Sequence, residues 1–365
     1  MTAAVSAQTA VCRIESGSGS AGQRFVCSGR EEKTEKPDPR RAGGKEGFLH
    51  MLTSLIIPCY NEEAVLPLLW RSLREVSEEL REKSRFEFIF VDDGSKDGTL
   101  KKLKDLAAED ERVVYLSFSR NFGKEAAMYA GLCNAKGDYA AIMDADMQDP
   151  PSLLPEMFRL MEEGYDSVAA RRVSRAGEPK LRSLGARLFY RLINRISDAD
   201  IVDGARDFRL MKREMVDAVV AMSEYHRFSK GIFGWVGFKT CWLPYENVER
   251  AAGETKWSFW GLLKYSVEGM INFSQVPLSI ASWCGIGLTG VSFVMIVFII
   301  ARKLLFGDPV AGWPSLACII VFLGGIELLC MGIMGQYLAK TYMEVKGRPH
   351  YIVGETNRED VKKIL

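Results

Sequence analysis

The stretch AIMDADMQDPP, residues 141–151, sets a group of acidic side chains directly behind a hydrophobic run. Asp144, Asp146 and Asp149 stand close together in the chain, with Gln148 beside the last of them and two prolines behind it. Carboxylates held this close repel one another and raise one another's pKa. The stretch therefore predicts either a bound cation at the end of a buried strand or a polar turn. In either case Asp149 is expected to cap the helix that follows the prolines.

Outward from this stretch, residues 51–245 alternate between strand-like and helix-like segments. We predict strands at SLIIP, FEFIFVDDG, RVVYLSF, DYAAIMDAD and DSVAARR, and helices at 62–83, DGTLKKLKDLAAED, GKEAAMYAGLCNA and 151–163. This alternation favours a doubly wound α/β sheet, in which ligands bind beyond the carboxyl ends of the strands. The polar clusters PCYNEE, VDDGSKDG and DADMQD all fall at such ends, which indicates one site rather than unrelated turns.

The composition excludes several classes of protein. The 365 residues carry a net charge of +1, so no basic field points to nucleic acid as a partner. The eight cysteines form no C-x-x-C pair, which is typical of free thiols in a reducing compartment rather than of disulfides or a zinc site.

The first fifty residues differ from the segment that follows them. Residues 1–50 are rich in Gly, Ser, Lys, Arg and Glu without apolar periodicity, so we expect a disordered N-terminal extension. They contain no apolar stretch typical of a signal peptide. Met51 directly precedes the first predicted strand and is a candidate natural start. We therefore place the α/β domain at residues 51–250.

The last third of the chain carries long apolar runs. Residues 276–300 contain no charge, and residues 313–338 contain only Glu327, which predicts two transmembrane helices joined by a short loop. Residues 251–275 suit an interfacial helix. The flanking Lys and Arg residues favour a multi-pass protein of the cytoplasmic membrane, with a cytoplasmic catalytic domain and a cytoplasmic tail at 339–365. GRPHYIV has strand character and could pair with another protomer, as in a homo-oligomer such as a tetramer.

The acidic stretch also suits a metal ion. Mg²⁺ and Mn²⁺ prefer oxygen ligands and are held by one or two carboxylates plus substrate phosphates. Asp144 and Asp146 could supply carboxylates and Gln148 an amide oxygen. A lone D-x-D is a weak signal, and here it gains weight from VDDGS and PCYNE at the ends of two earlier strands.

Together these motifs resemble a known family. IIPCYNEE, VDDGSKDGT, RNFGKEAA, MDADMQDPP, DFRLM, RFSKG and GETKW are similar to the inverting family 2 glycosyltransferases, which have the Rossmann-like GT-A fold. With the apolar helix pair behind them, they resemble more narrowly the polyprenyl-phosphate glycosyltransferases. That group includes bactoprenol glucosyltransferases and, more distantly, dolichol-phosphate mannose synthases. The resemblance covers residues 52 to about 353.

The resemblance implies roles for individual residues. The nucleotide sugar would be bound by Pro58, Tyr60, Glu62, Asp92, Asp93 and Asp144. Asp146 and Gln148 would hold Mg²⁺ or Mn²⁺ on the diphosphate. The phosphate of the acceptor would be bound by Arg171, Arg182, Ser183, Arg187, Arg250 and Lys256. Asp146, Asp207 and Arg209 would be catalytic, although DGARDF departs from the family pattern and leaves Asp203 as an alternative to Asp207. The basic run that begins at Arg171 could instead be a solvated helix face, and Lys256 a membrane anchor.

The implied reaction moves a hexose, with inversion, from a nucleotide sugar to a lipid. We expect UDP-glucose or UDP-N-acetylglucosamine as the donor, and undecaprenyl phosphate on the cytoplasmic leaflet as the acceptor, for modification of cell-envelope glycans. The alternatives are a GDP-mannose-dependent polyprenyl-phosphate mannose synthase and a non-catalytic membrane subunit that binds nucleotide. The second alternative predicts an eroded metal motif, whereas Asp144, Asp146 and Gln148 are all present.

Overall fold

The computed structural model describes residues 9–15, 24–28, 51–172, 204–245 and 312–364, together with single positions between 278 and 305. The chain forms two compact units. The first, which we call the α/β unit, holds residues 1–194, 199–258 and 349–365. The second, which we call the helical unit, holds residues 195–198 and 259–348.

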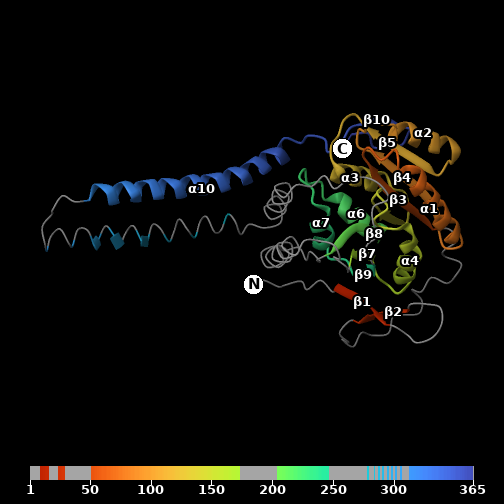
Figure 1. Ribbon diagram of the computed structural model, residues 1–365, viewed down its shortest axis with the longest axis horizontal. Helices are drawn as coiled ribbons and strands as arrows, with labels where there is room; N and C mark the ends of the chain where they lie inside the picture. Colours follow the sequence, from red (N-terminus) through yellow and green to blue (C-terminus); the bar gives the residue numbers. More distant parts are fainter. Residues whose placement is uncertain are drawn as a thin grey trace. The chain divides into compact units, whose positions relative to one another are not determined.

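A mixed sheet runs through the α/β unit (Figure 1). Its described strands lie in the order β10-β5-β4-β3-β6-β8-β7-β9-β1-β2. Their bounds are β1 Thr9–Glu15, β2 Arg24–Ser28, β3 Leu52–Cys59, β4 Arg85–Asp92, β5 Val113–Phe118, β6 Tyr139–Ile142, β7 Ser167–Arg172, β8 Ala205–Lys212, β9 Thr240–Tyr245 and β10 Val353–Thr356. β3 is parallel to β4 and β6, whereas β8 is antiparallel to both β6 and β7. The sheet is therefore parallel from β5 through β4 and β3 to β6, and antiparallel pairs join β10 to β5 and β8 to both of its neighbours.

Helices cover both faces of this sheet, which explains why β3 and β4 are almost continuous runs of buried residues. The described helices of the unit are α1 Leu66–Glu79, α2 Thr99–Glu109, α3 Lys124–Asn134, the 3₁₀ turn η2 Pro151–Leu153, α4 Leu154–Glu162, α6 Arg213–Ala221 and α7 Ser229–Trp235. α1, α2 and α4 share one hydrophobic core with alternate residues of β3 and β4, including Leu55, Ile57 and Phe88. On the other face, Gly131 of α3 lies directly against Ile56, where a β-carbon would come within 2.2 Å of that side chain.

The predicted strands and helices between residues 51 and 172 are confirmed, and their boundaries shift by a few residues. The helix predicted at 62–83 is shorter, because residues 62–65 form a turn before α1. The prediction that Asp149 caps the helix after the prolines is wrong. The turn at Pro151 receives no side-chain cap, and the Asp149 carboxylate instead accepts hydrogen bonds from Arg206 and Tyr245.

The N-terminal extension contains structure that the sequence analysis did not predict. β1 pairs antiparallel with β2 and parallel with β9. Both strands come from short runs with β-branched or aromatic residues, TAVCRIE and RFVCS, which suit a pleated surface. These runs are short, and the residues around them are rich in Gly, Ser and charged side chains, so composition alone predicted disorder. That prediction is wrong for these two segments.

The C-terminal segment is part of the α/β unit rather than a tail. β10 pairs antiparallel with β5 of the same chain. The segment GRPHYIV, for which pairing with another protomer was predicted, overlaps β10 only at Val353. Tyr351 is fully buried and stacks on Phe118, with ring centroids 5.4 Å apart. Arg358 donates to Glu87 at 3.2 Å. The predicted boundary at residue 250 therefore leaves out a strand and a fully buried aromatic residue.

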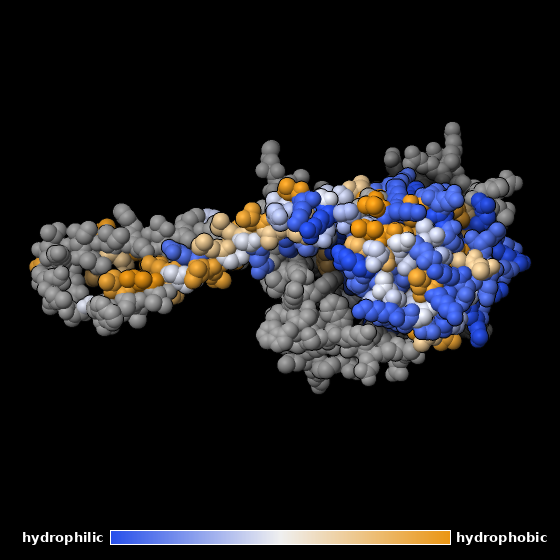
Figure 2. All heavy atoms as spheres, turned by 90° about the horizontal axis from the view of Figure 1, so that it is seen from above, coloured by the Kyte–Doolittle hydropathy of each residue, from blue (hydrophilic) through white to orange (hydrophobic). Residues whose placement is uncertain are grey.

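The helical unit contains α10, Trp313–Val345, which includes the second predicted span at 313–338 and continues beyond it. Of the described residues, those at Phe322–Val345 form the one helix that is long and apolar enough to cross a membrane. The predicted interfacial segment 251–275 lies outside the described residues, as does most of the predicted span 276–300, so a two-helix hairpin is not shown. Figure 2 shows hydrophobic side chains on the visible face of the helical unit, whereas the visible face of the α/β unit is mostly hydrophilic.

Candidate active site

The order of the strands predicts a binding crevice at the carboxyl ends of β3 and β6, and we call this end of the sheet the edge. The chain proceeds from β3 to β4 and β5 on one side and then crosses to β6 on the other side of β3. At such a switch point the connections diverge to opposite faces of the sheet and leave a crevice at the carboxyl ends of the strands. PCYNEE begins in the last two residues of β3 and DADMQD follows β6, so the sequence clusters meet at this edge.

Two carboxylates and a lysine form the centre of this edge. Asp144 follows β6 and Asp207 lies on β8, which is antiparallel to β6 with Ile142 opposite Arg209. Side chains alternate along a strand, so Asp207 points to the same face as Arg209, the face covered by α3. Lys124 is the first residue of α3. Its Nζ lies 2.6 Å from Oδ1 of Asp144 and 2.5 Å from Oδ2 of Asp207.

The charges of this cluster determine its protonation. Burial by itself would raise the pKa of Asp207, but the positive charges of Lys124, Lys230 and Arg206 outweigh that effect and hold the pKa well below its usual range. Burial would likewise lower the pKa of Lys124, and the carboxylates of Asp207 and Asp144 raise it above its usual value instead. The cluster is therefore an ionised bridge at neutral pH, and Asp207 is a poor proton acceptor.

The loop DADMQD has a strained turn at its centre. Met147 has a φ of +60°, in the left-handed region that a non-glycine residue enters at a cost. The amide N–H of Gln148 donates to Oδ1 of Asp146 at 3.1 Å, which closes the turn. The side-chain oxygen of Gln148 accepts a hydrogen bond from Nη2 of Arg206 at 2.9 Å. The turn thus places Asp146 and Gln148 close to each other after β6.

Arg206 is a residue of the site that sequence reasoning missed. Its Nε lies 3.1 Å from Oδ1 of Asp149, whose side chain is fully buried and also accepts from the hydroxyl of Tyr245. Burial raises the pKa of Asp149 despite the nearby charge of Arg206. Arg206 thus joins the DADMQD loop to β8 and counters the buried charge. Its position directly before Asp207 in the motif RDF was the available signal.

Most of the residues predicted to line the nucleotide pocket lie at the ends of β3 and β4 or in the loops that follow, and these two loops are hydrogen-bonded to each other. Asp144 lies in a third loop, after β6. Tyr60 is 39% exposed, and Pro58 and Glu62 are half-buried. Asn61 has a φ of +56°, and its backbone N–H donates to the Ser95 hydroxyl at 2.9 Å. The N–H of Glu62 donates to Oγ1 of Thr99 at 2.9 Å. The loop after β3 is therefore held in a left-handed turn against the loop after β4.

Asp92 and Asp93 take different places at the end of β4. Asp92 is buried and accepts from the Ser95 N–H at 3.0 Å and from the Ser117 hydroxyl at 2.8 Å, so it holds the turn. Asp93 accepts from the N–H groups of Phe122, at 2.6 Å, and Gly123, at 3.1 Å. Burial raises the pKa of Asp93 to about 6, although these two hydrogen bonds oppose the shift. Asp93 thereby fixes the loop that leads into Lys124.

Arg209 does not reach the edge with Asp207. It is 2% exposed and lies over the ring of Phe233 at 3.9 Å and that of Trp242 at 5.7 Å. Burial lowers the pKa of Arg209 to about 10. Its position indicates that Arg209 stabilises β8 through cation–π contacts with these two rings, rather than by direct contact with a substrate.

The predicted acceptor-binding residues are described only in part. Arg171 lies at the end of β7 beside Ala205, and therefore near the start of the strand that carries Asp207. The remaining predicted residues lie outside the described part of the chain: Arg182, Ser183, Arg187, Arg250, Lys256 and the alternative acid Asp203.

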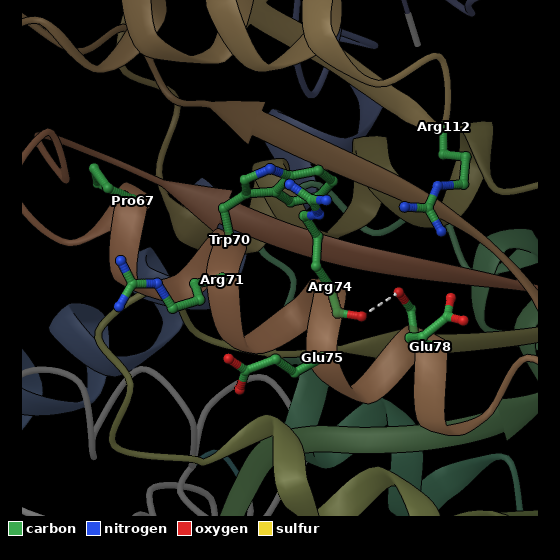
Figure 3. Close-up of a pocket in the computed structure, with 8 residues that line it drawn as sticks. Pro67, Trp70, Arg71, Arg74, Glu75, Glu78 and Arg112 are labelled. Carbon is green, nitrogen blue, oxygen red and sulfur yellow. Dashed lines mark hydrogen bonds between the residues drawn. The ribbon is translucent and has the colours of Figure 1, made fainter.

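A cavity of about 580 Å³ lies elsewhere, along α1. It is lined by Pro67, Trp70, Arg71, Arg74, Glu75, Ser77, Glu78 and Arg112. Figure 3 shows Arg71 and Glu75 on the exposed side of α1, and the dashed line marks the Ser77 hydroxyl donating to the Arg74 carbonyl at 2.9 Å. Arg112 is held by Asp110 at 2.7 Å. None of the predicted site residues lines this cavity.

The residues at the edge fit a divalent cation that is shared with a substrate. Among the described residues, no group of three or more His, Cys, Asp and Glu side chains gathers as a metal site. Asp144, Asp146 and Gln148 offer two carboxylates and an amide oxygen. Mg²⁺ and Mn²⁺ are held by such small sets when substrate phosphates complete the coordination. Asp149 does not fit this role, because its side chain is fully buried.

Known proteins resemble this chain over most of its length. The family described as Glycosyl transferase family 2 matches residues 54–220. CsbB of Bacillus subtilis (strain 168) is 43% identical over 306 residues, which are 84% of this chain and 92% of that protein. The prophage bactoprenol glucosyl transferase homolog of Escherichia coli (strain K12) is 41% identical over 303 residues, 83% of this chain and 98% of that protein. Glucosyl-3-phosphoglycerate synthase from Mycobacterium tuberculosis, solved with Mn²⁺, UDP and phosphoglyceric acid, gives a TM-score of 0.41 at 18% identity, over 69% of this chain and 84% of that one.

The α/β sheet with acidic loops at its switch point, in a chain this similar to glucosyl transferases over most of its length, defines the class: the protein is a glycosyltransferase enzyme. It belongs to glycosyltransferase family 2. The resemblance that the sequence motifs indicated is thereby confirmed.

Proposed function

We propose that the enzyme transfers a hexose, with inversion, from a nucleotide sugar to a polyprenyl phosphate at the membrane. UDP-glucose is the first donor to test and UDP-N-acetylglucosamine the second, because several relatives of about 40% identity are bactoprenol glucosyl transferases by name. The observation that carries the proposal is the ionised cluster of Asp144, Lys124 and Asp207 beside the DADMQD turn. It fits a transfer that needs charge stabilisation and positioning more than it needs a strong base.

The acceptor explains why no strong base is required. A phosphate monoester has a second pKa of about 6, so its oxygen is already ionised near neutral pH. That oxygen would attack the anomeric carbon while the bond from this carbon to the nucleoside diphosphate breaks on the opposite face. Asp207, with its lowered pKa, stays ionised throughout and holds Lys124 rather than accepting a proton. A divalent cation, when bound, would neutralise the charge that grows on the leaving diphosphate.

The chain's own residues would supply orientation. Tyr60, Glu62 and Asp93 lie on loops at the carboxyl edge and would bind the nucleoside, while Asp146 and Gln148 would hold the metal. Arg171, near the start of β8, would bind the phosphate of the acceptor, for which the planar fork of arginine is well suited. The apolar helix at Phe322–Val345 would keep the enzyme at the membrane that contains this acceptor.

Lipid extraction after incubation with labelled donors tests the proposal. Membranes containing the full-length protein are incubated with radiolabelled UDP-glucose, UDP-N-acetylglucosamine or GDP-mannose, and the organic phase is counted. We expect label from one UDP-sugar, its loss with EDTA, and its loss in Asp146→Asn. Asp105→Asn on the exposed face of α2 is the matched control and should retain activity. Label from GDP-mannose alone, or full activity in Asp146→Asn, would refute the proposal.

A further inference from the structure

Lys124 contacts acids from two different strands. The Nζ of Lys124 lies within salt-bridge distance of both carboxylates, 2.6 Å from Asp144 and 2.5 Å from Asp207. Asp144 belongs to the D-x-D motif and Asp207 to β8, so this one ammonium lies between carboxylates from two separate segments of the chain. Its side chain is 44% exposed, which leaves it accessible from the solvent side of the edge.

The backbone of Lys124 is held firmly on both sides. Before it, the carboxylate of Asp93 accepts from the N–H groups of Phe122 and Gly123, and Gly123 has a φ of +99° that favours glycine. After it, Glu125 accepts from the N–H and the hydroxyl of Ser229 at the start of α7. The ammonium can therefore change partners by side-chain rotation, while the position of its backbone is fixed relative to the nucleotide loops.

The positive charge of Lys124 lies between two negative charges. The Lys124 ammonium holds two carboxylates in one small region, where like charges otherwise repel. A divalent cation on the D-x-D motif would seek the same oxygen atoms of Asp144. A bound ion would therefore compete with Lys124 for the Asp144 carboxylate, and an ammonium released from Asp144 would be able to turn toward a phosphate.

We propose that Lys124 is a positioning residue whose ammonium supplies the positive charge between Asp144 and Asp207 while no metal ion is bound. Its ammonium holds Asp144 and Asp207 together, competes with the divalent ion for Asp144, and turns to a substrate phosphate when the ion takes that carboxylate. This inference rests on the proposed function, since it names the residue that prepares the same site. It predicts opposite effects of one substitution on metal binding and on turnover, which a purely structural role would not produce.

The test measures Mn²⁺ binding without nucleotide or acceptor, by the electron paramagnetic resonance signal of free Mn²⁺. Lys124→Met keeps the length of the side chain and removes the charge. We expect it to bind Mn²⁺ at least about tenfold more tightly than the native protein, because a unit charge beside the carboxylates is gone. Lys101→Met, on the exposed face of α2, is the matched control and should bind as the native protein does.

Turnover should change in the other direction. We expect kcat of Lys124→Met to fall at least about tenfold while KM for the nucleotide sugar changes less than about threefold, with partial rescue in Lys124→Arg. Mn²⁺ affinity that is equal or weaker in a folded Lys124→Met protein, including no binding by either protein, would overturn the inference. The Mn²⁺ titration uses no sugar donor or lipid, so the inference can stand or fall independently of the proposed reaction.

A measurement on the native protein covers the case in which Lys124→Met does not fold. Acetylation of individual lysines is followed by mass spectrometry with and without Mn²⁺ and UDP. We expect the acetylation rate of Lys124, relative to that of Lys101, to rise when Mn²⁺ is added alone, and to fall when UDP offers a diphosphate. A Lys124 rate that does not respond to Mn²⁺ would overturn the inference.

Discussion

Replacing Tyr351 by alanine should lower the free energy of unfolding of the α/β unit by about 3–5 kcal/mol, the usual cost of deleting a fully buried aromatic ring. Tyr351 is 0% exposed and stacks on Phe118 of β5. It also lies edge-on to Tyr129 of α3, with ring centroids 6.4 Å apart. The cavity cannot be filled from outside, because the ring is enclosed between the sheet and α3. A loss of this size is a large fraction of the stability of a typical domain.

The assay is thermal and urea-induced unfolding of the full-length protein in detergent, followed by intrinsic fluorescence. A loss of 3–5 kcal/mol corresponds to a decrease in Tm of about 6 °C or more in a unit of this size. Ile352→Ala is the matched control: its side chain is next in sequence and 38% exposed, so we expect a loss below about 1 kcal/mol. Equal melting of Tyr351→Ala and the native protein would refute the view that residues 349–365 are part of the α/β unit.

Three further predictions concern the site. The pKa of Asp93 is raised to about 6, so the buried Asp93 carboxylate lowers the free energy of unfolding as pH rises from about 4 to 6. In urea unfolding across this pH range, Asp93→Asn should therefore gain up to about 3 kcal/mol relative to the native protein. Parallel pH profiles of the two proteins would contradict this. Arg206→Met removes the cation beside the buried carboxylate of Asp149 and should lower the free energy of unfolding by about 3–5 kcal/mol. Adding Asp149→Asn should recover part of this loss. Losses that are additive in urea unfolding would show that the two side chains do not stabilise each other. Arg171→Ala should raise KM for the polyprenyl phosphate about tenfold or more, as expected for a lost charge-assisted contact of about 1.5–3 kcal/mol, while KM for the nucleotide sugar stays constant; the reverse split would contradict its assignment to the acceptor.

Local patterns were sufficient to predict the first half of the fold. β3 and β4 are apolar runs that end in polar clusters, and α1 between them is amphipathic, so periodicity identified all three. β8 and β9 were missed, because β8 combines Arg206, Asp207 and Arg209 with apolar residues and reads as a polar motif. GRPHYIV was predicted to be extended, but it shares only Val353 with β10, and the partner of β10 could not be found from sequence, since any unpaired edge would accept it.

The candidate site shows the same division between local and long-range information. The motifs placed Asp144, Asp146 and Gln148 correctly at a strand end, because this follows from their order in the chain. The partners of these residues depend on contacts across long separations: Lys124 meets Asp207 over 83 positions, and Arg206 meets Asp149 over 57. Conversely, Asp92 and Arg209 carry motif positions but are enclosed by the fold, which no local pattern indicated.

β10 covers the outer edge of β5, but it is synthesised long after that strand. Tyr115 of β5 and Asn357, which accepts its N–H at 3.0 Å, are 242 positions apart. At translation rates of about 5–20 residues per second, the outer edge of β5 waits roughly 12–50 s for the segment that will cover it. During that time the apolar helix α10 also leaves the ribosome, so the catalytic unit is completed only after the candidate membrane helix has been synthesised. An unpaired strand edge is a site where chains aggregate, and slow translation or a stop codon before residue 349 would prolong that exposure.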